Sequence, residues 1–199
     1  MEPNFDCQFS AYCTEREFLC KFIRDCPGRY AIEIGCFRGN TTRTLAQVCQ
    51  DVGKVLVGID PWNNSQDGAD GQTYQHFMSV VKPYVKSGSL IVVRGESQTV
   101  ALPPGVEGNC AMAFVDGRHH YPYCYQDMVR YYEVISPGGV LVMHDLFDFW
   151  KPHTQRGFNE FIGGLPRPVS VYHYVYYPTE EEVSRHGFGK AGLTYLYKE

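Results

Sequence analysis

The chain has 199 residues, of which 44% are hydrophobic and 20% charged, and this composition is typical of one globular domain and excludes a coiled coil, a collagen-like chain and a disordered chain. Its 18 basic and 22 acidic residues give a net charge of −4, so we expect no nucleic-acid partner. The longest apolar runs are far shorter than the roughly 18 residues that a membrane-spanning helix needs, so we expect no membrane partner.

The N-terminal residues carry neither a basic segment nor an apolar stretch, so we expect no signal peptide and predict a cytoplasmic protein. The eight cysteines form no Cys-x-x-Cys pair, and several lie inside apolar segments. We interpret them as reduced thiols of a cytosolic protein. The spacing of Cys7, Cys13, Cys20 and Cys26 suggests a zinc cluster but matches no ligand pattern.

Helical and strand patterns alternate along the chain. In chain order they predict a helix at 14–25, a strand at 30–34, a helix at 41–50, a strand at 54–59, a loop at 61–73, a helix at 74–85, strands at 89–93 and 111–115, a helix at 125–132, a strand at 140–143, a helix at 155–162, and strands at 169–177 and 193–198. Alternating strands and helices imply an α/β fold with a mostly parallel sheet. The last two strands have no helix between them, so we expect them to pair antiparallel.

Open α/β sheets bind their ligands beyond the carboxyl ends of the parallel strands. The first strand is followed by Gly35 and Gly39, which let the backbone turn tightly and approach a ligand. Glycines four residues apart, without a third, do not match the dinucleotide-binding fingerprint, so a plain tight turn is the alternative. The second strand ends at Asp60, which is placed either to bind both hydroxyls of a ribose or to form a turn before Pro61.

Two groups of motifs carry a family resemblance. Glu33, Gly35 and Gly39, followed by Asp60 and then Asp116, resemble class I S-adenosylmethionine-dependent methyltransferases. The segments 114–121 (FVDGRHHY) and 136–145 (SPGGVLVMHD) resemble a small-molecule O-methyltransferase-like branch with Asp-Gly-x-His-x-Tyr after strand four and His-Asp after strand five.

The resemblance covers about residues 28–199 and implies a three-layer, Rossmann-like, doubly wound sheet of seven strands, mostly parallel, with an antiparallel C-terminal strand. It implies a single methyltransferase domain at 1–199, with an N-terminal extension and helix at 1–27 and the core at 28–199. It also implies an enzyme that uses S-adenosyl-L-methionine and methylates a small-molecule acceptor, with a hydroxyl oxygen as the expected acceptor atom.

The resemblance assigns each matching residue a role in cofactor binding. Gly35 and Gly39 would pass close to the methionine part of the cofactor, and Glu33 would support that loop. Asp60 would bind the ribose hydroxyls. Trp62 would cover the adenine face, with packing at the sheet edge as the alternative.

Two further positions complete the cofactor site that the resemblance implies. Ser97, or its neighbour, would meet the adenine edge. Asp116 would close the cofactor site and face the substrate.

The resemblance also places a candidate catalytic centre after strands four and five. Some relatives hold a divalent cation there, and the matching residues are Asp116, His144 and Asp145. This donor set suits Mn²⁺, Fe²⁺ or Zn²⁺ and is less natural for Mg²⁺. Catechol-type enzymes have Asp-Asn where this chain has His-Asp, so the metal requirement stays open. Without a metal, His144 or His119 is the natural general base, because neutral imidazole is available near pH 7.

Two other functions fit the same motifs. One is an enzyme of this fold known as a hydroxylase, and the other is a non-catalytic S-adenosylmethionine-binding protein. The loops at 61–73, 147–153 and 178–191 are expected to wall a pocket for a small acceptor. An N-terminal helix and an aromatic surface would permit a homodimer.

Overall fold

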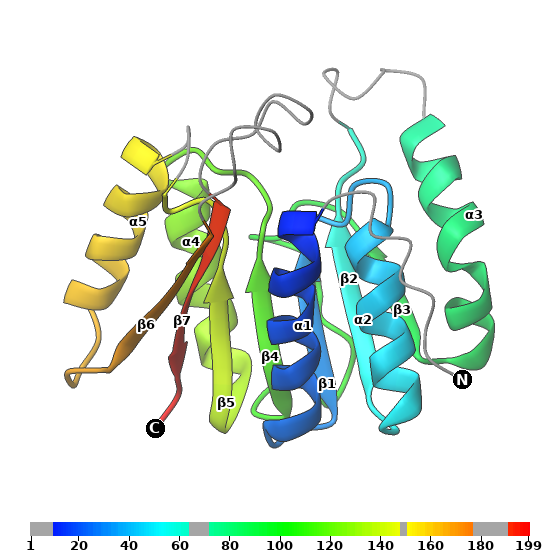
Figure 1. The fold of residues 1–199 in the computed structure, drawn as a ribbon, viewed down its shortest axis with the longest axis horizontal. Coiled ribbons are helices and arrows are strands. Elements are labelled where there is room, and N and C mark those ends of the chain that lie inside the picture. Colours follow the sequence, from blue (N-terminus) through cyan, green and yellow to red (C-terminus); the bar gives the residue numbers. More distant parts are fainter. Residues whose placement is uncertain (1–9, 64–71, 148–150, 177–190) are drawn as a thin grey trace.

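One seven-stranded sheet with helices on both faces forms the molecule (Figure 1). The computed structural model describes residues 10–63, 72–147, 151–176 and 191–199. Its elements are α1 (Ser10–Asp25), β1 (Tyr30–Ile34), α2 (Asn40–Asp51), β2 (Val55–Asp60), α3 (Gln72–Ser87), β3 (Leu90–Arg94), β4 (Cys110–Val115), α4 (Tyr123–Val134), β5 (Ile135–Met143), α5 (Lys151–Gly163), β6 (Val171–Tyr176) and β7 (Ala191–Tyr197). Every helix and strand predicted from the sequence is present; β1 has the predicted bounds, and the others differ at one or both ends.

The strand order is β3-β2-β1-β4-β5-β7-β6. Strands β1 to β5 pair in parallel, whereas β7 runs antiparallel to both β5 and β6. The prediction of a mostly parallel sheet with an antiparallel C-terminal strand is therefore confirmed. Strands β2 and β3 lie on one side of β1, whereas β4 and β5 lie on the other. The strand order therefore switches between β1 and β4, and a ligand crevice is expected beyond the carboxyl ends of these two strands.

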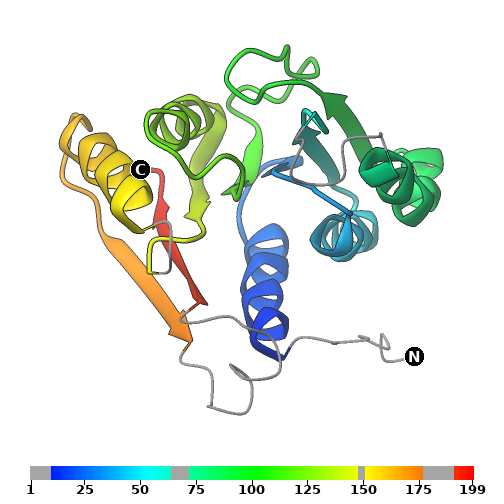
Figure 2. The ribbon, with the colours of Figure 1, turned by 90° about the horizontal axis from the view of Figure 1, so that it is seen from above.

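The three layers are clear when the molecule is seen from above (Figure 2). Helices α1, α2 and α3 cover one face of the sheet, and α4 and α5 cover the other. Each helix layer packs on the sheet through its own core cluster, with Leu19, Leu45 and Phe77 in one and Met128 and Phe158 in the other. Because both faces are covered, all six residues of β4 are buried, which explains its continuous apolar sequence.

Strand β5 begins five residues earlier than the sequence predicts. The sequence Pro137-Gly138-Gly139 favours a turn, but the structure continues the strand through it from Ile135. The pairing with β4 shifts register in this segment, and Lys198 exchanges two backbone hydrogen bonds with Gly138 and Gly139. Pairing with the C-terminal segment therefore overrides the local turn preference.

No helix in the described ranges is long and apolar enough to cross a membrane. The six cysteines whose side chains are described are free and buried, as expected of reduced thiols. The side chains of Cys7 and Cys13 lie outside the described part, as do most of the loop residues expected to wall the acceptor pocket. The single-domain boundaries stay a prediction.

Candidate active site

The loop after β1 comes so close to the end of β4 that only glycine fits. Gly35 has a φ of 90°, and a Cβ built on it would lie 2.1 Å from the backbone oxygen of Asp116. Gly39, with a φ of 84°, precedes α2, and its Cβ would lie 3.0 Å from the Phe77 ring. Both predicted glycines therefore hold the loop against its neighbours at the carboxyl edge of the sheet.

Asp60, at the end of β2, organises this loop with its carboxylate. Oδ2 accepts backbone hydrogen bonds from Cys36 (3.0 Å) and Phe37 (2.9 Å), and Oδ1 accepts one from Trp62 (2.7 Å). Phe37 and Trp62 both have positive φ angles, of 46° and 44°, which are strained for residues with a side chain. The carboxylate thus stabilises two unfavourable backbone conformations at the edge where a ribose is expected.

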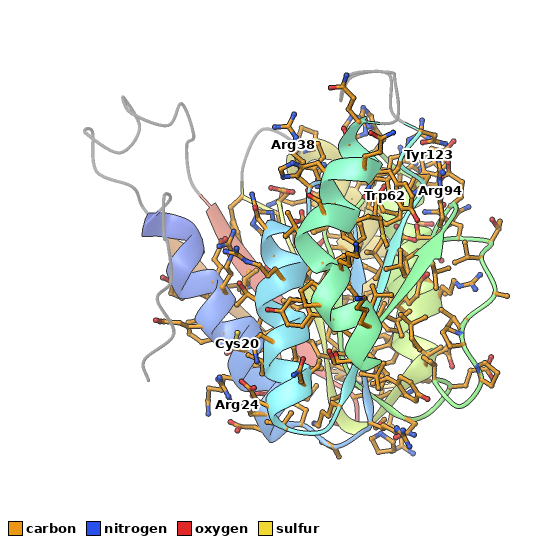
Figure 3. All side chains as sticks on the ribbon, turned by 90° about the vertical axis from the view of Figure 1, so that its right-hand side faces the viewer. Cys20, Arg24, Arg38, Trp62, Arg94 and Tyr123 are labelled. Carbon is orange, nitrogen blue, oxygen red and sulfur yellow. The ribbon has the colours of Figure 1, made fainter. Side chains whose placement is uncertain are left out.

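Trp62 is largely buried. Its ring packs on Tyr74 and Phe77, with centroids 5.0 and 4.6 Å away, and its Nε1 donates to the backbone oxygen of Phe37 at 2.8 Å. Figure 3 shows Trp62 and Arg94 at the same end of the molecule, where the Arg94 guanidinium lies 4.9 Å from the centre of the Tyr74 ring. These contacts are those of the packing alternative, and a contact of Trp62 with adenine stays a prediction.

A buried polar network lies after β3. The Ser97 backbone oxygen accepts from the Tyr131 hydroxyl at 2.7 Å, and the Gln98 amide donates to the Ser97 hydroxyl and to Asp127 Oδ1, both at 2.9 Å. Burial raises the pKa of Asp127 to about 7. Because the Gln98 amide nitrogen is engaged twice, its oxygen is the atom left to accept from a ligand.

Glu33 is almost fully buried in β1, directly before the glycine loop. Burial raises its pKa to about 8. Its Oε2 has no hydrogen-bond partner within the described ranges, and Arg16 of α1 is a nearby cation. A neutral Glu33 beneath the loop agrees with the supporting role predicted for it, which stays a prediction.

Four predicted side chains meet beyond β4 and β5. His144 Nδ1 lies 2.9 Å from Asp145 Oδ1 and 3.4 Å from Asp116 Oδ1. His119 Nε2 lies 2.5 Å from Asp145 Oδ2 and 3.5 Å from Asp116 Oδ1. Asp145 has a φ of 60°, and its backbone oxygen accepts from the Thr154 hydroxyl of α5 at 2.7 Å. The two motifs that lie far apart in sequence therefore form one cluster.

A fifth side chain, that of Glu15 in α1, joins this cluster by contacting the His144 ring on the side opposite Asp116 and Asp145. Its Oε2 lies 3.3 Å from His144 Nε2, and only 4% of its side chain is exposed. Phe114 of β4 stands edge-on to the His144 ring, at 6.1 Å between centroids. The ring of His144 is thus held on several sides.

The cluster combines three carboxyl groups with two imidazoles. Burial lowers the pKa of His119, but the carboxyl groups of Asp116 and Asp145 outweigh it and raise that pKa to about 10. The same balance raises the pKa of His144 well above its ordinary value, and burial raises that of Asp116. Both rings are therefore positively charged imidazolium groups at pH 7 in this arrangement, which differs from the neutral imidazole expected from the sequence.

The donor atoms of Asp116, His144 and Asp145 suit a single cation. One ligand atom from each lies within 4.8 Å of the others. Two ligands of one ion, each about 2.0–2.6 Å from it, are at most about 5 Å apart. The three residues predicted from the sequence thus fit a divalent cation, and their nitrogen and oxygen donors suit a transition metal.

Sequence reasoning did not find Glu15 or Asp127, and it covered Gln98 only as an unnamed neighbour of Ser97. A signal existed for two of them. Glu15 lies on the face of α1 that buries Leu19, and Asp127 lies on the face of α4 that buries Met128. A carboxylate within an apolar helical stripe is costly to bury, so it marks a position with a specific partner.

Residues 32–146 match a methyltransferase-domain family, which is more than half of the chain. The chain belongs to this methyltransferase family. The matched segment runs from β1 to just beyond β5, and so contains the glycine loop, Asp60 and the four predicted cluster residues. Together with its sheet topology, this match gives the chain a class I S-adenosylmethionine-dependent methyltransferase domain.

Individual relatives are distant. The methyltransferase is 25% identical over 146 residues to uncharacterized protein R132 of Acanthamoeba polyphaga mimivirus, an alignment that covers 67% of this chain and 59% of that protein. The chain therefore spans less than two thirds of the length of that relative.

Solved structures share the fold. The O-methyltransferase TomG from Streptomyces achromogenes, in complex with S-adenosylmethionine, is 18% identical with a TM-score of 0.63 and coverage of 94% of this chain and 80% of TomG. An O-methyltransferase from Bacillus cereus, in complex with S-adenosylhomocysteine, is 16% identical with a TM-score of 0.59 and coverage of 93% and 81%. At this identity the likeness shows the fold of the methyltransferase and does not decide its acceptor.

Proposed function

We propose that this methyltransferase moves the methyl group of S-adenosylmethionine to a hydroxyl oxygen of a small-molecule acceptor. The observation that carries the proposal is the position of the cluster of Asp116, His119, His144 and Asp145. It lies directly beside the glycine loop, because Asp116 is also the residue that Gly35 approaches. The group that binds the cofactor and the groups that handle a proton thus share one edge of the sheet.

The proposed cofactor site uses the loop geometry described above. The backbone at Gly35 and Gly39 would pass close to the methionine part, and the Asp60 carboxylate, at the end of β2 beside this loop, would accept hydrogen bonds from the ribose hydroxyls. The oxygen of the Gln98 side-chain amide would accept from the exocyclic amino group of adenine.

Methyl transfer is an in-line displacement. The acceptor oxygen forms its bond to the methyl carbon while the carbon–sulfur bond breaks, and the electron pair of that bond stays on sulfur to give S-adenosylhomocysteine. The hydroxyl proton must pass to a base. Of the two imidazoles, His119 is the more accessible, with 25% of its side chain exposed against 12% for His144, so His119 is the proposed base.

A divalent cation held by Asp116, His144 and Asp145 would orient the acceptor oxygen and lower the pKa of its hydroxyl. Binding of a cation by Asp116 and Asp145 would offset the charge that raises the pKa of His119, and its imidazole would then be able to accept a proton. The metal therefore belongs to this proposal. A homodimer and the absence of a nucleic-acid partner stay predictions.

The first test is calorimetric titration of metal-stripped protein with S-adenosylhomocysteine, repeated with Mn²⁺ and with Mg²⁺. We expect micromolar binding that Asp60→Ala abolishes. Screening of hydroxylated small molecules would then follow the formation of S-adenosylhomocysteine, with His144→Ala and Asp145→Ala as inactive variants.

The outcomes separate the alternatives. Turnover that releases no S-adenosylhomocysteine would favour a hydroxylase-like reaction. Cofactor binding without turnover of any acceptor would favour a non-catalytic binding protein. Full activity of folded His144→Ala and Asp145→Ala proteins would remove the cluster from the mechanism.

A further inference from the structure

Helix α1 precedes the segment that matches the family, yet it supplies a side chain to the cluster. Glu15 is 3% exposed, and its Oε2 lies 3.3 Å from Nε2 of His144. Its other oxygen, Oε1, is buried with no hydrogen-bond partner in the described ranges. Glu15 therefore directs its one described polar contact at His144.

Placing a carboxylate here is unfavourable for folding alone. Leu19 and Ile23 share the buried face of α1, and an apolar residue at position 15 would extend their stripe. Replacing a buried charged pair by apolar side chains is often neutral or stabilising, so a carboxylate buried here is a candidate for a role other than stability.

The two ring nitrogens of His144 face different partners. Nε2 faces Glu15, whereas Nδ1 faces Asp145 and Asp116 at 2.9 and 3.4 Å. Carboxylate oxygens accept hydrogen bonds, so both ring nitrogens can donate in the metal-free cluster. A cation held by Asp116 and Asp145 would replace the hydrogen on Nδ1, which faces them, and would leave the hydrogen on Nε2, which faces Glu15. The partner on one nitrogen fixes which nitrogen can act as a ligand or base.

We infer that Glu15 is a positioning residue that holds His144 through Nε2–H, so that Nδ1 is the nitrogen presented to the site formed with Asp116 and Asp145. The edge-on contact with Phe114 restricts the ring in the same orientation. The use of Nδ1 as a cation ligand rests on the proposed function, whereas the orientation of the His144 ring does not.

The test compares Glu15→Met, which keeps the length of the side chain and removes its acceptor, with Glu15→Gln, which keeps one acceptor oxygen. Glu17→Gln is the matched control, because Glu17 lies on the same helix and is exposed. Three quantities are measured for each protein. They are the protected Nε2–H signal of His144 in ¹⁵N-labelled metal-free protein, the affinity for Mn²⁺, and the affinity for S-adenosylhomocysteine.

We expect Glu15→Met to lose the protected Nε2–H signal and to bind Mn²⁺ about 10- to 100-fold more weakly, the usual effect of removing the partner of a ligating histidine. Its affinity for S-adenosylhomocysteine and its melting temperature should not fall. Glu15→Gln should restore part of the Mn²⁺ affinity, and Glu17→Gln should match the wild type.

Two results would overturn the inference. One is a Glu15→Met protein that keeps both the Nε2–H signal and the wild-type affinity for Mn²⁺. The other is a parallel loss of Mn²⁺ and S-adenosylhomocysteine binding, which would indicate general damage to the fold. If the wild-type protein bound no Mn²⁺, the proposed cation site would fail, and the Nε2–H signal alone would decide the role of Glu15.

Discussion

Replacing Asp60 with Asn tests whether one carboxylate both holds the glycine loop and binds the cofactor. The wild-type group accepts three backbone hydrogen bonds, two on Oδ2 from Cys36 and Phe37 and one on Oδ1 from Trp62. An Asn side chain has a single oxygen. In its better orientation it keeps the two bonds to the loop and turns its own N–H groups towards the Trp62 N–H.

The expected cost follows from this count. Asn loses at least one charge-assisted hydrogen bond and weakens the others, and such a bond contributes about 1.5–3 kcal/mol. The strained φ angles of Phe37 and Trp62 lose part of their support at the same time. We therefore expect the free energy of unfolding to fall by about 2–3 kcal/mol, the loss of one such bond with some relaxation.

Urea unfolding and calorimetric titration with S-adenosylhomocysteine measure the two roles separately. Asp51→Asn is the matched control, because Asp51 is an exposed carboxylate at the end of α2 that accepts one side-chain hydrogen bond from Gln47. An exposed change of this kind should stay within about 0.5 kcal/mol of the wild type. Equal stability of the Asp60→Asn and Asp51→Asn proteins would refute the loop argument. Unchanged cofactor affinity would refute the ribose role.

Three further predictions concern packing and buried ionisable groups. Gly35→Ala should lower the free energy of unfolding by more than about 3 kcal/mol because its Cβ would lie 2.1 Å from a backbone oxygen, whereas Gly53→Ala, with open space and a φ of 71°, should cost about 1 kcal/mol. The pKa of Asp127 is raised from 3.8 to about 7 in the folded protein. The protonated side chain therefore stabilises the fold fully below pH 3.8, and this stabilisation is lost as the pH rises through 7. In Asp127→Asn, the change in the free energy of unfolding between pH 4 and 8, measured by urea unfolding, should be smaller by about 4 kcal/mol. Burial raises the pKa values of Cys49 and Cys110 to about 12, so iodoacetamide at pH 8 should label neither thiol in the folded protein, and mass spectrometry showing fast labelling of both would contradict their burial.

The positions of the strands along the chain were predictable because each strand carries a short apolar segment bounded by turn residues. The ends were less predictable where distant segments pair. Strand β5 includes Gly138 and Gly139 because Lys198, about sixty residues later, supplies their backbone partners. Local sequence at a Pro-Gly-Gly segment favours a turn, and nothing nearby in the chain indicates that a strand from the C-terminus will arrive there.

The predicted site residues converge because of a topological rule. In a parallel sheet, residues that follow successive strands lie at one edge, so Gly35, Asp60, Asp116 and Asp145 could be grouped before their distances were known. The protonation of the cluster could not be predicted in the same way. It depends on the 2.5–3.5 Å contacts that set two imidazoles among three carboxyl groups, and those contacts are products of the complete fold.

Three acidic residues interrupt apolar patterns in this chain, and all three are buried at the same edge of the sheet. Glu33 is the next-to-last residue of β1, Glu15 lies in the first half of α1, and Asp127 lies in the first half of α4. Each belongs to a different layer of the fold, and each would be cheaper to bury as an apolar residue. Prediction from the hydrophobic pattern alone treats such residues as exceptions within an apolar helix face or strand. The sheet order places all three beneath the edge that carries the proposed cofactor site. That common position, rather than the local pattern, explains why polar groups interrupt three apolar stretches there.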